Sequence, residues 1–314
     1  MVRVAVTGVA GYIGGWVRLV FASRGHEVSG QDRFPCGEHA VFDLADADAR
    51  RAWLAEVRPD VVLHLAALYG RVWGERNLIS TAAANAGVTA ELARDCDAAA
   101  IPLMFVSSSE VYGRSAMTGT VGPYSPLEPL NMYGLSKKWG EEACWLYAPG
   151  GLMVARLNMP YGPPCDLPAA GERPRTSGVP GTVGYNVLHS MLWEAKHGLP
   201  LVVHEGTDRC LTWAGDAVTG LAMIIERRAA GTFNVCRNDD HRPVQHLAEM
   251  VLDVTGSASK IIREAPPYQV TPRKSLDNAG LLGLGWVPTM ALDEGAKLCW
   301  EYFARFGSDG TWHG

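Results

Sequence analysis

The sequence predicts an α/β protein whose main domain is a doubly wound parallel sheet, followed by a smaller C-terminal lobe. Apolar runs suited to buried strands recur through the first half of the chain, at 2–7, 26–31, 60–65, 101–107 and 151–157. Helical patterns separate these runs, at 12–24, 46–57, 76–99 and 132–147. Because each helix carries the chain back across the sheet, this alternation predicts that the strands lie parallel.

The first predicted strand leads directly into a glycine-rich turn, Thr7-Gly8-Val9-Ala10-Gly11-Tyr12-Ile13-Gly14. Glycines at every third position allow a tight turn, a close approach to a pyrophosphate and close packing of the next helix. The free N–H groups of that helix then face the anion. The turn therefore predicts a dinucleotide site, and the residues assigned to it are Gly8, Gly11, Tyr12, Ile13 and Gly14.

An acidic residue, Asp32, follows the second predicted strand. A carboxylate here suits the ribose diol of NAD and repels the 2′-phosphate of NADP, although the adjacent Arg33 leaves NADP open. Further along, Asp43 and Leu44 are assigned to the adenine end of the cofactor, because a carboxylate accepts hydrogen bonds from an exocyclic amine. The alternative for Asp43 is a helix N-cap.

The apolar run at 60–65 leads into His64-Leu65-Ala66-Ala67, at the sheet edge where open α/β sheets bind ligands. The two alanines are small enough for the backbone to touch a dinucleotide, so Leu65, Ala66 and Ala67 are predicted cofactor contacts. His64 is predicted to be a core histidine rather than a catalyst.

Composition narrows the class of protein. The 314 residues, 47% of them hydrophobic, suffice for one large α/β domain with a smaller lobe or for two domains. The net charge is −5 and the charges do not cluster, which predicts a small-molecule substrate rather than nucleic acid or a membrane surface. The seven cysteines are scattered without a C-x-x-C pair, which predicts no metal site and a reducing, cytoplasmic location. We expect no targeting leader, and no apolar run reaches the ~18 residues of a membrane span.

Beyond residue 163 the pattern is less regular. A stretch rich in Gly, Pro and Arg at 169–184 predicts a mobile loop over the site. The later elements are predicted at 185–197, 201–203, 211–228, 243–255 and 291–305.

The strand at 101–107 continues into Ser107-Ser108-Ser109-Glu110, which places hydroxyls and a carboxylate at the carboxyl edge of the sheet. Further along, Tyr133 and Lys137 lie one helical turn apart on one face. A phenol has a reference pKa of about 10, and the Lys137 ammonium is expected to lower it. Tyr133 then takes the proton of a hydroxyl held by Ser108 as hydride leaves. By itself, the tyrosine-lysine pair is more typical of a solvated helix face.

Taken together and in order, these motifs resemble an extended short-chain dehydrogenase/reductase, and more narrowly the nucleotide-sugar epimerase/dehydratase family. The family patterns are T-G-x-x-G-x-x-G, H-x-A-A, S-S-x-x-V-Y-G, Y-x-x-x-K and R-x-x-N-x-Y-G-P. They are matched here at 7–14, 64–67, 107–113, 133–137 and 156–163. Asn85-Ala86-Gly87 also matches a structural asparagine of the family.

The resemblance implies a Rossmann sheet, NAD as the cofactor and a nucleotide-diphosphate sugar as the substrate, which passes through a transient 4-keto intermediate. Tyr133 inherits the role of the base and contacts the sugar. Ser108 and Lys137 assist it. Ser107, Tyr133, Lys137 and Pro160 join the cofactor contacts, and Lys137 is expected to hydrogen-bond the nicotinamide ribose.

The resemblance also implies contacts to the substrate diphosphate. Arg209, in a segment beginning at Gly206 that is similar to the family's G-x-x-x-R pattern, and Arg273 are expected to clamp it through forked hydrogen bonds. Asn186 is expected to add a contact at a helix N-terminus.

Four more residues are expected near the sugar. Ser109 and Asn158 are assigned to it, although Asn158 lies one place earlier than the asparagine of many family members. Tyr69 and Arg71, just after the H-x-A-A segment, either set sugar specificity or simply pack.

Glu110 most divides the possible reactions. It matches a glutamate found in dehydratases and uronate decarboxylases, which simple 4-epimerases generally lack. Burial beside the nicotinamide is expected to raise its pKa and make it a base at C5 of the keto sugar. The alternative is a structural carboxylate that accepts backbone N–H bonds.

We therefore expect residues 1–162 and 206–236 to form an NAD-binding domain, and 163–205 and 237–314 a nucleotide-sugar-binding lobe. The expected activity is that of an NAD-dependent epimerase/dehydratase, with epimerisation, dehydration and decarboxylation all open. The alternatives are an NAD(P)H-dependent 4-ketoreductase and a non-catalytic dinucleotide sensor. We expect a homodimer.

Overall fold

The computed structural model describes residues 1–35, 37–165, 186–266 and 270–305, so the loop expected at 169–184 lies outside the described residues. Its strands are β1 (Arg3–Thr7), β2 (Glu27–Asp32), β3 (Ala40–Val41), β4 (Val61–His64), β5 (Leu103–Ser108), β6 (Met153–Leu157), β7 (Pro160–Tyr161), β8 (Leu201–His204), β9 (Asp208–Arg209), β10 (Thr212–Trp213), β11 (Gly231–Val235), β12 (Arg242–Pro243) and β13 (Ile261–Glu264). Its α-helices are α1 (Tyr12–Ser23), α2 (Ala47–Val57), α3 (Arg71–Arg76), α4 (Leu78–Ala82), α5 (Val88–Ala98), α6 (Met132–Tyr147), α7 (Val187–Lys196), α8 (Ala214–Glu226), α9 (Val244–Thr255), α10 (Ala279–Gly283) and α11 (Leu292–Ala304).

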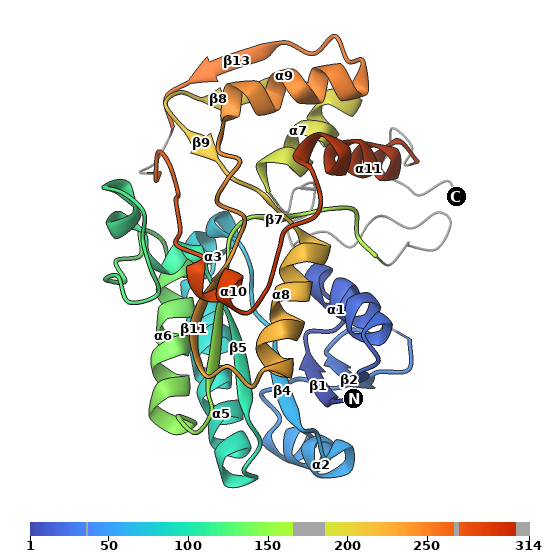
Figure 1. The fold of residues 1–314 in the computed structure, drawn as a ribbon, viewed down its shortest axis with the longest axis vertical. Coiled ribbons are helices and arrows are strands. Elements are labelled where there is room, and N and C mark those ends of the chain that lie inside the picture. The colour runs from blue at the N-terminus through green and yellow to red at the C-terminus, as the bar shows by residue number, and fades with distance from the viewer. Residues whose placement is uncertain (36, 166–185, 267–269, 306–314) are drawn as a thin grey trace.

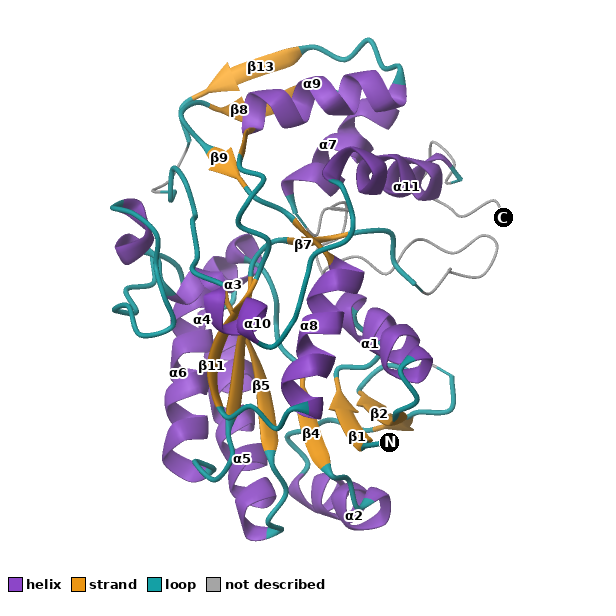
Figure 2. Cartoon of the chain, viewed as in Figure 1, coloured by secondary structure: helices purple, strands orange, loops and turns teal. Residues whose placement is uncertain are grey.

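The large domain is built on one parallel sheet (Figures 1 and 2). Within the described part of the chain, seven strands pair in the order β11-β6-β5-β4-β1-β2-β3, and every pairing is parallel. Successive side chains enter opposite faces of the sheet, as a strand's period of two requires. Along β5, Phe105 enters the core covered by α2 and α5, whereas Met104 enters the larger core covered by α1 and α8. Helices thus cover both faces, which confirms the doubly wound parallel fold.

Two features of the sheet and its helices differ from the sequence pattern. The strand β11 was not predicted, because Gly231–Val235 is short and only half buried at the sheet edge. The helix predicted at 76–99 is present from Leu78 to Ala98, but Asn77 separates it from α3, and a π-helical turn at Ala83–Gly87 interrupts its α-helical geometry between α4 and α5. The π turn brings Asn85 into contacts made by tertiary structure, which a helical period does not encode.

The smaller lobe lies beyond the carboxyl ends of the strands (Figure 1). Helices α7, α9 and α11 pack on one another there, next to the parallel strand pair β8–β13. The expected division into 1–162 with 206–236, and 163–205 with 237–314, stays a prediction, although β11 joins the large sheet as that division requires.

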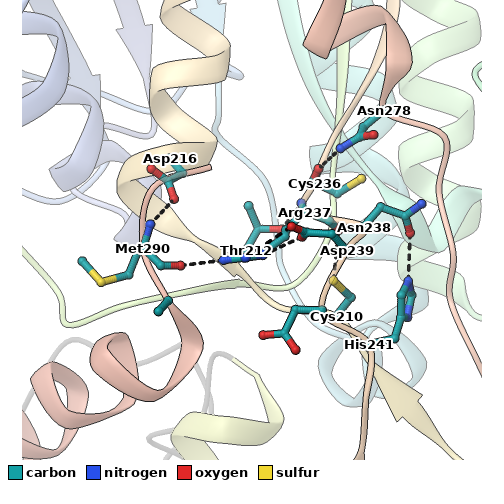
Figure 3. Close-up of polar contacts among 12 residues, drawn as sticks. Cys210, Thr212, Asp216, Cys236, Arg237, Asn238, Asp239, His241, Asn278 and Met290 are labelled. Carbon is teal, nitrogen blue, oxygen red and sulfur yellow. Dashed lines mark hydrogen bonds and ion pairs between the residues drawn. The ribbon is translucent and has the colours of Figure 1, made fainter. Parts of the chain in front are cut away.

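A network of hydrogen bonds links the segments at 210–216, 236–241 and 290, which connect the large sheet with the smaller lobe (Figure 3). The Arg237 guanidinium donates to the Met290 oxygen at 2.8 Å, and Asp216 accepts the Met290 N–H at 3.1 Å. The Arg237 backbone is held from the other side, because Thr212 accepts its N–H at 3.0 Å and Cys210 donates to its oxygen at 3.2 Å. Segments from three parts of the chain are therefore held in place where they pass from one lobe to the other.

No helix within the described ranges is both long enough and apolar enough to cross a membrane. The same ranges contain no group of three or more His, Cys, Asp or Glu side chains arranged to hold a metal ion.

Candidate active site

The sheet order reverses between β1 and β4, which is where open α/β sheets bind ligands. The glycine turn follows β1 at this point, and Gly8 adopts a φ of +75°, which favours glycine. A Cβ at Gly8 would lie 2.7 Å from the Ala66 nitrogen, and one at Gly14 would lie 2.4 Å from the Val9 oxygen. The turn therefore has the tight backbone that contact with a pyrophosphate requires.

Helix α1 begins directly after Gly11, with no acidic residue in its first turn and no cap from a described side chain. A helix start of this kind directs its first N–H groups toward a bound anion. The Tyr12 hydroxyl donates to the Gly162 oxygen at 3.0 Å, and Ile13 packs against the core. Both side chains fix the start of the helix, and their contacts with a cofactor stay predictions.

Asp32 lies over the glycine turn. Its carboxylate accepts the Ala10 N–H at 3.0 Å and the Phe34 N–H at 3.1 Å, so its position is set from both sides. The Arg33 guanidinium lies over the Phe34 ring, 4.9 Å from its centroid. The carboxylate is therefore held at the end of β2, where a ribose diol is expected.

Asp43 does not cap a helix. It accepts the Ala45 N–H at 2.9 Å in a short turn, and the N-cap of α2 is Asp46, which accepts the N–H of Asp48 at 3.1 Å. Leu44 is buried. The adenine contacts of Asp43 and Leu44 stay predictions.

The serine, tyrosine and lysine assigned to proton transfer come together at the end of β5. Tyr133 and Lys137 lie on the buried face of α6, which begins at Asn131 because that side chain accepts the Gly134 N–H at 2.8 Å. Ser108 ends β5 and hydrogen-bonds to Tyr133.

Burial controls the protonation of these groups. It raises the pKa of the Tyr133 phenol above its ordinary value, and the hydrogen bond with Ser108 offsets only part of that rise. Burial also lowers the pKa of Lys137 to about 8. The expected lowering of the phenol's pKa is therefore wrong, because burial, together with the neighbouring Tyr69 and Glu110, raises it. The Lys137 ammonium lies 4.2 Å from the centroid of the Phe105 ring, whose face attracts a cation.

A second observation indicates that these residues fit a dinucleotide. The Ser107 hydroxyl is buried and, within the described part of the chain, has no hydrogen-bond partner. Leaving such a group unpaired costs about 1–3 kcal/mol, which a hydrogen-bonding ligand would offset. Leu65, Ala66 and Ala67 lie at the same sheet edge, directly after β4. Together with the glycine turn and Asp32, this edge fits NAD.

Cationic and amide groups surround Glu110. Arg71 donates to it at 3.1 Å and Asn131 at 2.7 Å, and the Lys274 ammonium pairs with its second oxygen. Burial by itself would raise the pKa of Glu110, but the charges of Lys274 and Arg71 outweigh it, so the pKa lies well below its ordinary value. The expected rise in pKa is therefore wrong, and Glu110 is an ionised carboxylate and a weak base.

Lys274 is the functional residue that sequence reasoning missed. It lies 164 positions from Glu110 along the chain, so no local motif joins the two. Neighbouring side chains of an extended segment point to opposite sides. Lys274 is buried, whereas its neighbour Arg273 is exposed and lines a cavity of about 310 Å³ together with Met117 and Thr120. The phosphate role assigned to Arg273 stays a prediction.

Tyr69 lies next to the base, and Arg71 lies next to Glu110. The Tyr69 and Tyr133 rings meet edge to face with centroids 5.4 Å apart. Ser109 and Asn158, by contrast, hydrogen-bond to each other at 2.9 Å, and both are buried. Asn158 also donates to the Cys210 oxygen at 3.1 Å. These bonds give Ser109 and Asn158 structural roles, and their contacts with a sugar stay predictions.

The remaining assigned residues lie between the lobes. Arg209 donates to the backbone oxygens of Asp208 and Thr271, at 2.7 Å and 3.2 Å. Asn186 caps α7 and donates to the Pro160 oxygen at 2.7 Å. The structure thus joins Asn186 to Pro160, one assigned to substrate and the other to cofactor.

Fold and site together define a class of enzyme. A buried tyrosine beside a dinucleotide-binding turn, at the carboxyl edge of a doubly wound sheet, serves hydride transfer in the extended short-chain dehydrogenases/reductases. The chain belongs to the NAD dependent epimerase/dehydratase family, which matches residues 4–236. The family predicted from the sequence, and NAD as that family's cofactor, are confirmed.

The chain is similar to two curated decarboxylases along most of its length. UDP-N-acetyl-alpha-D-glucosaminuronate decarboxylase of Bacillus cytotoxicus is 27% identical over 339 aligned positions, which cover 98% of this chain and 99% of that protein. UDP-glucuronic acid decarboxylase 1 of Xenopus tropicalis is 25% identical, over 96% of this chain and 72% of that protein. Among solved structures, the Thermus thermophilus UDP-glucose 4-epimerase complex with NAD superposes with a TM-score of 0.82 at 23% identity, over 96% of this chain and 99% of that chain. That likeness shows the fold.

Proposed function

We propose that the protein removes the carboxylate of a nucleotide-diphosphate-linked uronic acid through a 4-keto intermediate. The Glu110 cluster carries this proposal. Lys274 and Arg71 place two positive charges around Glu110, whose carboxylate lies near enough to Tyr133 to raise the pKa of its phenol, and this suits an anionic sugar. The same two charges keep Glu110 too weak a base to take a proton from carbon. Both curated relatives described above are decarboxylases of UDP-linked uronic acids.

The first step needs only the residues at the end of β5 and on α6. Bound NAD would supply the hydride acceptor for C4 and later return the hydride. Ser108 holds the C4 hydroxyl, and Tyr133 takes its proton as the carbon is oxidised. Because burial raises the pKa of the phenol, Tyr133 must lose its own proton before it can accept this one, and the positive charges of Lys137 and of bound NAD would favour that ionised form.

The resulting ketone is β to the carboxylate on C5. The bond between C5 and the carboxyl carbon breaks, CO₂ leaves, and the electron pair moves onto the C4 oxygen as an enolate. Ser108 and the protonated Tyr133 donate hydrogen bonds to that oxygen. C5 then takes up a proton and C4 is reduced. Because no step removes a proton from C5, the weakly basic Glu110 is compatible with decarboxylation, whereas dehydration requires such a base.

We place the substrate diphosphate between the lobes. Arg209 and Asn186 support this placement, because both lie where the smaller lobe meets the sheet edge and both are already oriented by backbone oxygens. Arg273 completes the clamp in this proposal, and Tyr69 and Arg71 contact the sugar.

Mass spectrometry with a panel of nucleotide sugars tests the reaction. We expect a loss of about 44 Da, the mass of CO₂, from a uronic-acid substrate and no reaction with the neutral hexose. A loss of about 18 Da would mean dehydration and would contradict the proposal. An unchanged mass with inverted C4 would indicate the second candidate, uronate 4-epimerisation, which also needs no base at C5.

Glu110→Gln should lower both the turnover and the KM for the uronate. Removing the carboxylate takes away the negative charge that Lys274 and Arg71 share, so their positive charges hold the substrate carboxylate more tightly in its ground state, which slows the loss of CO₂. We expect reduced nicotinamide to accumulate, measured by its near-ultraviolet absorbance, while CO₂ release falls about tenfold or more. Wild-type turnover and KM in the folded variant would show that the carboxylate is only structural.

Asp32→Ala should narrow the preference for NAD over NADP. The loss of a charged hydrogen bond to the ribose is worth about 1.5–3 kcal/mol, or roughly ten- to a hundredfold in NAD affinity. Titration of both cofactors into wild type and variant measures the change. Asp32→Asn, which keeps the shape without the charge, separates repulsion of the 2′-phosphate from hydrogen bonding. Equal wild-type affinities for the two cofactors would contradict the assignment.

Two rival functions are separated by the cofactor. A 4-ketoreductase would exchange NADPH with solution at each turnover, whereas the proposed enzyme regenerates NAD within the site and should retain it through purification. A non-catalytic sensor has no need of the buried Tyr133 and Lys137.

We also propose a homodimer and a cytoplasmic location. Helix α6 exposes a run of large apolar side chains that a second copy would cover, namely Trp139, Trp145, Leu146 and Tyr147. None of the described cysteines forms a disulfide with another, which a reducing compartment favours.

A further inference from the structure

A buried chain of hydrogen bonds runs across the sheet beneath the active site. Its side chains are at most 1% exposed and come from β1, β4, the π turn, α5 and α6; they are Thr7, His64, Asn85, Thr89 and Ser136. The His64 ring lies in the middle, with Nδ1 2.7 Å from the Thr7 hydroxyl and Nε2 2.9 Å from the Thr89 hydroxyl. No sequence motif assigned a role to this histidine beyond packing.

The proton positions in this chain follow from its two ends. The Thr89 hydroxyl donates to the Asn85 backbone oxygen at 2.9 Å, and a carbonyl oxygen only accepts. Because the only hydroxyl proton of Thr89 is already in that bond, the Thr89 oxygen must accept a hydrogen bond from His64. The imidazole proton is therefore on Nε2. Burial and the charge of Lys137 lower the pKa of His64 to about 3, so the ring is neutral and Nδ1 is an acceptor.

The other end reaches the cofactor edge. Since Nδ1 accepts, the Thr7 hydroxyl donates to it, and the Thr7 oxygen accepts the Ala66 N–H at 3.3 Å. Every donor in the chain thus points the same way, from the Ala66 backbone to the Asn85 carbonyl. Ala66 is the residue whose backbone packs against Gly8 in the glycine turn.

Asn85 connects the chain to the catalytic helix. Its side chain pairs with both backbone groups of Leu68, accepting the N–H at 2.7 Å and donating to the oxygen at 2.9 Å. It also donates to the Ser136 hydroxyl at 3.0 Å, and that hydroxyl donates to the backbone carbonyl oxygen of Tyr133 at 2.8 Å. The stretch after β4 and the helix that carries the base therefore share one buried network.

We propose that His64 is a positioning residue: as the neutral Nε2–H tautomer, it aligns the 66–68 backbone that faces the cofactor with the helix that carries Tyr133. The proposal rests on a dinucleotide binding at this edge and does not depend on the identity of the sugar. The alternative is a histidine that only fills space in the core.

Nitrogen-15 NMR of the histidine-labelled protein tests the tautomer without cofactor or substrate. The signal of His64 is identified by its loss in a His64→Asn variant. We expect a proton on Nε2, none on Nδ1, and no titration between about pH 5 and 8. A proton on Nδ1, or titration near the ordinary pKa of about 6.5, would overturn the proposal.

Two substitutions of His64 each remove one of its two hydrogen bonds and keep the other. In His64→Asn, the amide oxygen replaces the acceptor Nδ1 and keeps the Thr7 bond. In His64→Gln, the amide nitrogen replaces the donor Nε2 and keeps the Thr89 bond. We expect the dissociation constant of NADH to rise about five- to tenfold in His64→Gln and to change less than about threefold in His64→Asn. Only His64→Gln loses the bond to Thr7, which in turn holds the Ala66 N–H. Equal NADH affinity in both variants and wild type would overturn the proposal.

A second pair of variants covers the case in which substitution of His64 prevents folding. Thr7→Val keeps the shape of the side chain but removes the hydroxyl, and it should weaken NADH binding as His64→Gln does. Thr7→Ser keeps the hydroxyl and should restore the affinity to within about twofold of wild type. Unchanged NADH affinity in Thr7→Val would overturn the proposal.

Discussion

Replacing Tyr133 by phenylalanine should lower turnover by roughly two to four orders of magnitude, the usual cost of removing an acid–base group. The phenol is the group that hydrogen-bonds to Ser108 at the end of β5. Phenylalanine keeps the ring that packs edge to face on Tyr69. Steady-state turnover measures the loss, and NAD affinity should stay close to that of wild type.

Tyr147→Phe is the matched control, because it removes a hydroxyl from the same helix at its exposed end. Its turnover should equal that of wild type. Substantial activity in Tyr133→Phe would contradict the assignment of the base. A fall in NAD affinity as large as the fall in turnover would place the phenol's role in cofactor binding.

The large domain was predictable because its signals are local. A buried parallel strand reads as an apolar run, and the glycine turn has its required neighbours, a strand before it and a helix after it. The alternation of Phe105 and Met104 between two cores follows from the period of two. The edge strand β11 lacks such a signal, since only its last two residues, Asn234 and Val235, are buried.

The candidate site was predictable where one short segment holds the whole pattern. Tyr133 and Lys137 lie on one helix, and Ser108 ends a strand that leads toward them. The charge state of Glu110 was not predictable, because it depends on Arg71 and Lys274, which come from distant segments. Burial raises the pKa of a carboxylate and cations lower it, so the sign is decided only when both partners are placed.

A similar long-range pair gives the second large expected effect, this time on stability. Arg156 in β6 and Glu141 in α6 form an ion pair with N–O distances of 2.6 Å and 2.9 Å, and both side chains are nearly inaccessible to solvent. Arg156 also donates to the Tyr112 hydroxyl at 2.8 Å, which donates in turn to Asn234 in β11 at 2.7 Å. The pair thus joins the catalytic helix to two strands of the sheet.

Glu141→Leu should lower the free energy of unfolding by about 3–5 kcal/mol, because it leaves the Arg156 guanidinium buried without its counter-charge. Burial by itself would lower the pKa of Arg156. The hydrogen bonds and negative charge of Glu141 outweigh this effect of burial, so the pKa of Arg156 is raised. Chemical denaturation measures the loss. Adding Arg156→Met to Glu141→Leu removes the stranded charge, so the double variant should regain much of the stability lost in the single one.

The same substitution should reach the active site through Lys137. Glu141 lies one turn beyond Lys137 on α6, and its negative charge raises the pKa of that ammonium against the lowering caused by burial. Glu141→Leu should therefore lower the pKa of Lys137 further, and the activity of the folded variant should depend on a Lys137 ionisation shifted to lower pH. The pH profile of kcat, measured at a temperature where Glu141→Leu is folded, checks this. A loss of stability below about 1 kcal/mol together with an unchanged pH profile would show that the ion pair contributes neither to stability nor to the pKa of Lys137.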